Sequence, residues 1–183
     1  MDTQAFILAF KRADPAPVAA AIAAACMLTI GGFLFFQYVM ELPPCPLCLE
    51  QRNAFYFSLP LAALLWFGVD HGASRKVLMA GFGALAIVML YNAGLGAYHA
   101  GIEWKFWPGP ADCTGPLNDL SGPGGLLNRL KNISVVRCDQ AAWRFLGLSL
   151  AGWNVLVSLT HAAVAAHGFR GMVARGALKK TAR

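Results

Sequence analysis

The stretch that decides the fold is residues 43–52, which read PPCPLCLEQR. Cys45 and Cys48 form a C-x-x-C pair, a spacing that lets two sulfur atoms close a small disulfide ring. The positive end of a helix dipole favours a thiolate over a thiol. Arg52 follows Cys48 by four residues, so the two share one face of a helix. The stretch therefore predicts a redox-active pair at the start of a helix.

The sequence on both sides of this stretch is that of a membrane protein. Hydrophobic residues make up 57% of the 183 residues and charged residues 13%, too few to build a soluble surface. A membrane-spanning helix needs about 20 apolar residues, and four segments qualify. They cover residues 18–40, 52–69, 76–100 and 145–169. The predicted fold is a single all-α membrane domain, a bundle of four transmembrane helices.

Lysine and arginine predict the orientation of this bundle. The two termini and the loop between the second and third segments carry nine basic residues and three acids. The basic residues are Lys11, Arg12, Arg75, Lys76, Arg170, Arg175, Lys179, Lys180 and Arg183, and the acids are Asp2, Asp14 and Asp70. The other side balances six basic residues against six acids, so the whole net charge of +6 lies on one face. The positive-inside rule makes this face cytoplasmic, with both termini inside and residues 41–51 and 101–144 forming two outer redox loops.

The same charge pattern bears on the partners of the chain. A basic cytoplasmic face suits anionic membrane lipid. The basic residues are not interleaved with a module that stacks on bases or reads a groove, so no nucleic-acid partner is predicted.

The predicted topology sorts the five cysteines. Cys45 and Cys48 lie in the first outer loop, Cys113 and Cys138 lie in the second, and Cys26 stands alone in the first helix as a small buried residue. An oxidising compartment favours disulfides, and two structural bridges that pin the loops are one interpretation. The C-x-x-C spacing favours a redox role for the first pair, because a ring this short restrains little chain entropy.

The residues leave two further questions about the cysteines open. For the second pair taken alone, a structural and a redox role stay equally open. A zinc site built from all four outer cysteines is the other alternative. It is disfavoured because Cys113 and Cys138 lack paired spacing, and no metal site is predicted.

These features together resemble the DsbB family, the bacterial disulfide bond formation protein B. The resemblance rests on four helices, the C-x-x-C pair followed by Glu50-Gln51-Arg52, and a second cysteine pair in a longer outer loop. The run Trp143-Arg144-Phe145-Leu146-Gly147-Leu148 is also similar to the family's entry into its fourth helix. The resemblance covers nearly the whole chain.

The resemblance implies a quinone-dependent thiol oxidase of the bacterial inner membrane. A periplasmic thioredoxin-like oxidase, DsbA or a relative of it, would attack a Cys113–Cys138 disulfide, with Cys113 forming the mixed disulfide. Electrons would then pass to Cys45–Cys48, and Cys48 would hand them to a bound quinone, ubiquinone or menaquinone. Such a relay sustains disulfide bond formation in secreted proteins.

Two further residues enter through the resemblance. Arg52 would assist at the quinone, because a guanidinium stabilises both a Cys48 thiolate and negative charge growing on a quinone oxygen. The alternative for Arg52 is an interfacial anchor or a partner for Glu41 or Glu50. The family has a histidine that faces the quinone near His99, although Ala100 is an equally good positional match; an ordinary interfacial histidine is the alternative.

Two rival functions also stay open. A non-enzymatic membrane protein with structural disulfides is the first. The second is an enzyme similar to vitamin K epoxide reductase, which would carry its C-x-x-C pair in a late helix, and no such pair follows Cys48.

Overall fold

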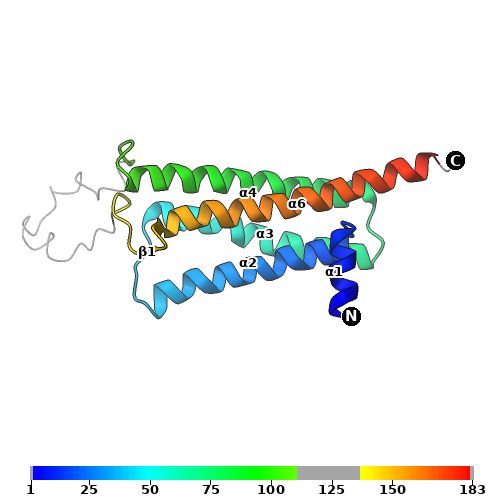
Figure 1. Ribbon diagram of the computed structural model, residues 1–183, viewed down its shortest axis with the longest axis horizontal. Helices are drawn as coiled ribbons and strands as arrows, with labels where there is room; N and C mark the ends of the chain where they lie inside the picture. The colour runs from blue at the N-terminus through cyan, green and yellow to red at the C-terminus, as the bar shows by residue number, and fades with distance from the viewer. Residues whose placement is uncertain (1, 111–136, 182–183) are drawn as a thin grey trace, which may run out of the picture.

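Four long helices pack side by side in the computed structural model, which describes residues 2–110 and 137–181 (Figure 1). The elements are α1 (Thr3–Lys11), α2 (Pro15–Tyr38), α3 (Pro46–Asp70), α4 (Arg75–Glu103), β1 (Arg144–Phe145), β2 (Leu148–Ser149) and α6 (Leu150–Thr181). The closest packing joins α4 to α6 and α2 to α3. The end of the bundle that carries Cys45, His99 and Cys138 is called the redox end here. Helix α1 and the far end of α6 lie at the opposite end (Figure 1).

The bundle is apolar outside and carries polar groups inside. Leu28, Leu64 and Ile87 are 78%, 66% and 69% exposed, while Asn92 and Ser158 are buried between helices. Among the described residues, two helices, α2 and α4, are long and apolar enough to cross a membrane. An apolar surface of this extent has a favourable partner in lipid and none in water. The helical fold and its membrane character match the prediction, and spans at α3 and α6 stay predicted.

Helix α3 begins six residues earlier than the sequence analysis placed it. Pro46 is its first residue, a position where the missing proline N–H costs nothing, and Cys45 is the N-cap. The predicted first redox loop, 41–51, is therefore wrong over residues 46–51, which are helical. Cys48 therefore lies in the first turn of α3, which agrees with the helix start predicted at the C-x-x-C pair and not with the predicted loop.

The entry to α6 also differs from the prediction. Residues 145–149 were expected to be helical, but Arg144–Phe145 and Leu148–Ser149 pair as a small antiparallel hairpin. Leu146 and Gly147 have φ values of 52° and 82°, the pair of positive angles that a tight two-residue turn requires. Helix α6 then runs to Thr181, well past the predicted end at residue 169, because no proline follows to stop it.

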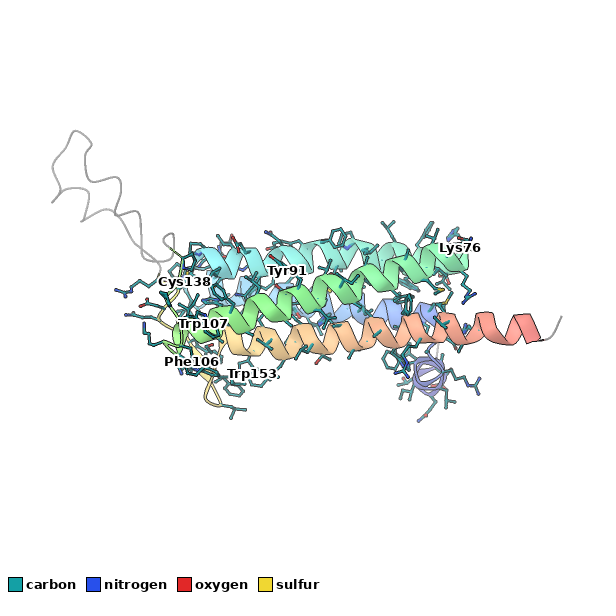
Figure 2. The ribbon with its side chains drawn as sticks, turned by 90° about the horizontal axis from the view of Figure 1, so that it is seen from above. Lys76, Tyr91, Phe106, Trp107, Cys138 and Trp153 are labelled. Atoms are coloured by element: carbon teal, nitrogen blue, oxygen red, sulfur yellow. The ribbon has the colours of Figure 1, made fainter. Side chains whose placement is uncertain are left out.

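Two smaller boundary differences complete the comparison. Helix α4 extends to Glu103 instead of residue 100, so the predicted second loop, 101–144, loses its first residues to α4 and its last to β1. Helix α1 was not predicted, and it lies across the end of the bundle (Figures 1 and 2). It is held there by the Phe10 carbonyl, which lies 2.9 Å from His167 Nε2.

Candidate redox site

The C-x-x-C pair is held by the first turn of α3. Cys45 Sγ accepts the backbone N–H of Cys48 at 3.2 Å, and the two sulfur atoms lie 2.7 Å apart as free thiols. Hydrogen bonding to Cys48, followed by contact with His99, lowers the pKa of Cys45 to about 5 against the opposing effect of burial. The lowered pKa favours the thiolate form of Cys45, the reactive form in thiol–disulfide exchange.

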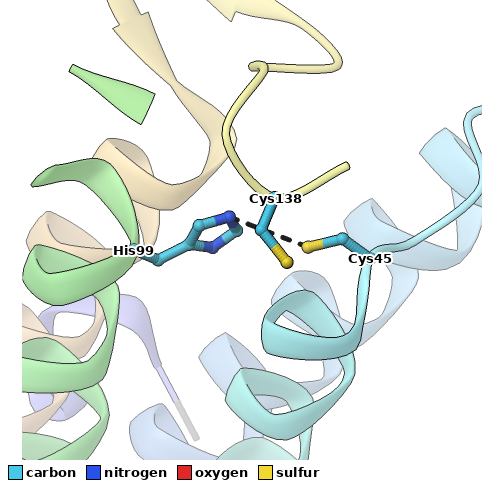
Figure 3. A group of neighbouring side chains, drawn as sticks. All are labelled: Cys45, His99 and Cys138. Carbon is cyan, nitrogen blue, oxygen red and sulfur yellow. Dashed lines mark hydrogen bonds between the residues drawn. The ribbon is translucent and has the colours of Figure 1, made fainter. Parts of the chain in front are cut away.

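His99 reaches this pair from α4 (Figure 3). Its Nε2 atom lies 3.7 Å from Cys45 Sγ and 3.9 Å from Glu103 Oε1, and its Nδ1 atom lies 2.8 Å from Gln51 Nε2. The residue is only 2% exposed. His99, rather than the neighbouring Ala100, is thus the residue that lies beside the sulfur atom of Cys45.

Cys138 approaches the same point from the segment before the hairpin (Figures 2 and 3). It is buried and disulfide-bonded. The reactive atoms of Cys45, His99 and Cys138 all lie within 4.8 Å of one another. Cys113, which the family resemblance pairs with Cys138, lies outside the described residues. The structure therefore brings one cysteine of the second predicted pair against the first pair.

An ion-pair cluster holds the Cys138 segment against the end of α4. Asp139 accepts from Arg137 at 2.8 Å and from Lys105 at 2.6 Å, and Lys105 also donates to the Asp139 carbonyl at 2.8 Å. Arg137 and then Lys105 hold the pKa of Asp139 well below its usual range. The neighbouring Cys138 is thereby kept beside Cys45, although each exposed ion pair alone contributes little stability.

A cavity of about 390 Å³ lies next to the C-x-x-C pair and is lined by Cys48. Its walls are mostly apolar side chains of α2, α3, α6 and the segment that joins α2 to α3. They include Leu28, Phe33, Phe36, Leu42, Phe55, Trp153 and Val157. Cys48, Arg52, His99 and Asn154 add polar groups to this lining. A cavity of this size with few convergent polar groups is typical of a small-molecule site.

Arg52 is held at the cavity wall by α2. Its guanidinium donates to Gln37 Oε1, and its Cζ atom stands 4.6 Å from the centre of the Phe33 ring. Among the described residues Arg52 forms no ion pair, so neither Glu41 nor Glu50 takes its charge. The charged side chain therefore forms part of the cavity wall, together with Cys48.

Comparison with known proteins agrees with the site. The sequence model of the family described as "DsbB: Disulfide bond formation protein DsbB" matches residues 15–168. The chain belongs to the DsbB family. The resemblance predicted from the sequence is thus confirmed, and with it the character of a membrane oxidoreductase of disulfide bond formation.

Several relatives of this DsbB-family chain are named Disulfide bond formation protein B. The protein from Aromatoleum aromaticum is 33% identical over 143 residues, which are 77% of this chain and 83% of the relative. The protein from Polaromonas sp. is 29% identical over 154 residues, 81% of this chain and 87% of the relative. The protein from Xanthomonas oryzae pv. oryzae is 30% identical over 139 residues, 72% and 77% of the two chains. No solved structure matches the chain.

The structure brings together five of the six predicted site residues of this DsbB-family protein, and the sixth, Cys113, lies outside the described residues. The sequence analysis did not name Gln51, Glu103 or Asn154 as site residues. Gln51 and Glu103 lie next to His99, and Asn154 donates to Gln51. Each is a polar residue at the end of an apolar segment or within it, and this position could have marked it in the sequence. The predicted zinc alternative loses its basis, because a disulfide-bonded Cys138 has no thiolate to offer a metal.

Proposed function

We propose that this protein oxidises a periplasmic thioredoxin-like dithiol protein and passes the two electrons through two cysteine pairs to a membrane quinone. One observation carries the proposal. Within the C-x-x-C pair, Cys45 lies beside the disulfide-bonded Cys138, and Cys48 lines an apolar cavity. A structural disulfide needs neither neighbour, whereas a relay between a protein and a lipid-soluble oxidant needs both.

The sulfur steps follow from thiol–disulfide exchange. A thiolate of the reduced partner attacks Cys113 of a Cys113–Cys138 disulfide, forms a mixed disulfide and releases Cys138 as a thiolate. The partner's second thiol then resolves the mixed disulfide and leaves with its own disulfide formed. Cys138 attacks Cys45 of an oxidised first pair, the sulfur within 4.8 Å of it, and releases Cys48 as a thiolate. Cys113 displaces Cys45 from Cys138, which re-forms the second disulfide and leaves the first pair as a dithiol.

The residues around the cavity fit a quinone. Its apolar walls suit a hydrophobic ring, while Arg52 and His99 are polar groups suited to ring oxygens. A bound quinone would supply an acceptor for two electrons and two protons from the Cys45 and Cys48 dithiol. Cys48 lines the cavity whereas Cys45 faces Cys138, so each sulfur has its own neighbour in the relay. Arg52 lines the same cavity as Cys48, and its positive charge would favour the thiolate form of Cys48 during the relay.

We further propose that α2, α3, α4 and α6 all cross the bacterial inner membrane, with the redox end in the periplasm and both termini in the cytoplasm. Nine of the fifteen basic residues but only three of the nine acids lie in the two terminal segments or around the loop between α3 and α4, which supports this orientation. Phe106 and Trp107 are exposed at the redox end (Figure 2), and Trp104 is exposed at the C-cap of α4. Aromatic side chains in these places suit the membrane interface.

The cavity assignment is tested by filling it. Gly32 lines the cavity, and a Cβ atom added there meets no atom within 4 Å, so Gly32→Leu places a side chain in the cavity without a helix clash. We expect the apparent KM for quinone to rise about tenfold or more, with the KM for reduced partner unchanged. The matched control is Gly31→Leu, because Gly31 has the same open surroundings and does not line the cavity. Equal effects of the two variants, or a change confined to the partner KM, would contradict the assignment.

A further inference from the structure

A series of hydrogen-bonded polar side chains, buried except for the half-buried Asn154, leads from the middle of the bundle to the redox site. Asn92 Nδ2 on α4 donates to Asn154 Oδ1 on α6 at 3.3 Å and to Ser158 Oγ at 2.9 Å. Asn154 Nδ2 then donates to Gln51 Oε1 on α3 at 2.6 Å. Gln51 Nε2 lies 2.8 Å from His99 Nδ1, whose ring ends at Cys45. These hydrogen bonds therefore link α3, α4 and α6 to the sulfur atom of Cys45.

One backbone carbonyl oxygen determines how the amide groups of Gln51 and Asn154 are oriented. Gln51 Nε2 also lies 3.2 Å from the carbonyl oxygen of Leu47, inside the C-x-x-C motif. A carbonyl oxygen can only accept, so the amide group that faces Leu47 must be the NH₂. The Gln51 oxygen is then turned toward Asn154, which must donate to it. The Leu47 carbonyl thus fixes which way both amide side chains point.

The same constraint fixes the proton of His99. Because the Gln51 group beside Nδ1 is a donor, Nδ1 must accept, and the ring proton must sit on Nε2. Nε2 is the atom 3.7 Å from Cys45 Sγ and 3.9 Å from Glu103 Oε1, both of them acceptors. We propose that Gln51, supported by Asn154, is a positioning residue that holds His99 as the Nε2–H tautomer and directs that proton at Cys45.

A purely structural explanation of the polar chain accounts for less. Hydrogen bonds between helices explain why Asn92, Asn154 and Ser158 are tolerated in the bundle. They do not require Gln51 to face Leu47 and His99 with the same nitrogen. The opposite tautomer would set an N–H of His99 against an N–H of Gln51, which leaves two buried donors without an acceptor. The His99 tautomer does not depend on the proposed quinone function. Only its role in the electron relay rests on that function.

Nitrogen NMR on the reduced protein, without quinone or partner, measures the tautomer directly. The chain has four histidines, and the His99 signals are assigned by their loss in His99→Asn. We expect His99 Nδ1 to give the signal of an unprotonated nitrogen and Nε2 that of a protonated one. A protonated Nδ1 in the unaltered protein would overturn the inference, whatever the outcome of the quinone experiments.

The Gln51→Glu variant makes the test specific. A carboxylate of the same shape offers His99 an acceptor where the amide offered a donor, so we expect Nδ1 to become protonated. Asn154→Leu should leave Nδ1 unprotonated but broaden its signal, because Gln51 keeps Leu47 and loses its second restraint. Thr160→Leu is the matched control on the exposed side of α6 and should leave the His99 signals unchanged. An unprotonated Nδ1 in Gln51→Glu would show that Gln51 does not set the tautomer.

Discussion

Replacing Cys138 with serine is expected to abolish turnover and to accumulate a mixed disulfide between Cys113 and the thioredoxin-like partner. Without Cys138 the second pair cannot hold a disulfide, so reduced partner has nothing to attack. The free Cys113 thiol instead attacks the disulfide of the oxidised partner and releases one partner thiol. This exchange needs no external oxidant or reductant. The released partner thiol can only reverse this step, and Cys138, the sulfur beside Cys45 that would compete for Cys113, is gone.

The trapped species is measured by non-reducing electrophoresis and by mass spectrometry of the linked peptides. Cys26→Ser is the matched control, because Cys26 is a free thiol buried in the apolar core of α2, and it should turn over at the normal rate. A linkage through Cys45 instead of Cys113 would contradict the order of the relay.

The second large effect is expected at Arg52. Its guanidinium is held at the cavity wall by Gln37 and the Phe33 ring, one helical turn from Cys48. Losing a charged hydrogen-bond donor at a partly buried site costs about 1–3 kcal/mol, which is roughly a 5- to 150-fold effect. Arg52→Ala should therefore raise the apparent KM for quinone by that factor and leave the KM for reduced partner nearly unchanged. Steady-state kinetics with each substrate varied in turn measures both constants.

Two further variants separate charge from position. Arg52→Lys keeps the charge but loses the planar fork, so its effect should lie between those of the unaltered protein and Arg52→Ala. Arg170→Ala removes an exposed arginine of α6, far from the cavity, and should change neither constant. An Arg52→Ala protein with a raised partner KM and a normal quinone KM would return Arg52 to the role of a membrane anchor.

The local features of the site could be predicted from the sequence. The C-x-x-C pair, its place at a helix start and the proximity of Arg52 all depend on residues within one or two turns. The starting residue of α3 was missed because an apolar pattern cannot locate a first turn, whereas Pro46 at the first helical position could have done so. The hairpin before α6 could likewise have been suspected from Gly147.

The contacts that join the helices could not be predicted in the same way. Gln51 meets Asn154 across 103 residues of sequence and His99 across 48, and no local pattern encodes such pairings. Asn92 and Asn154 are polar residues within apolar segments, a signal that the sequence analysis did not use. Only the packing of α3, α4 and α6 shows that they belong to one chain that ends at Cys45.

The central claim, that electrons pass from a protein dithiol to a quinone through both cysteine pairs, is tested by counting under anaerobic conditions. Purified protein is mixed with excess reduced thioredoxin-like partner and a limiting quinone, and both products are quantified. The account predicts one quinone reduced for each partner disulfide formed, and none reduced with Cys48→Ser. Partner disulfides formed without quinone reduction, or quinone reduction that survives in Cys48→Ser, would contradict it.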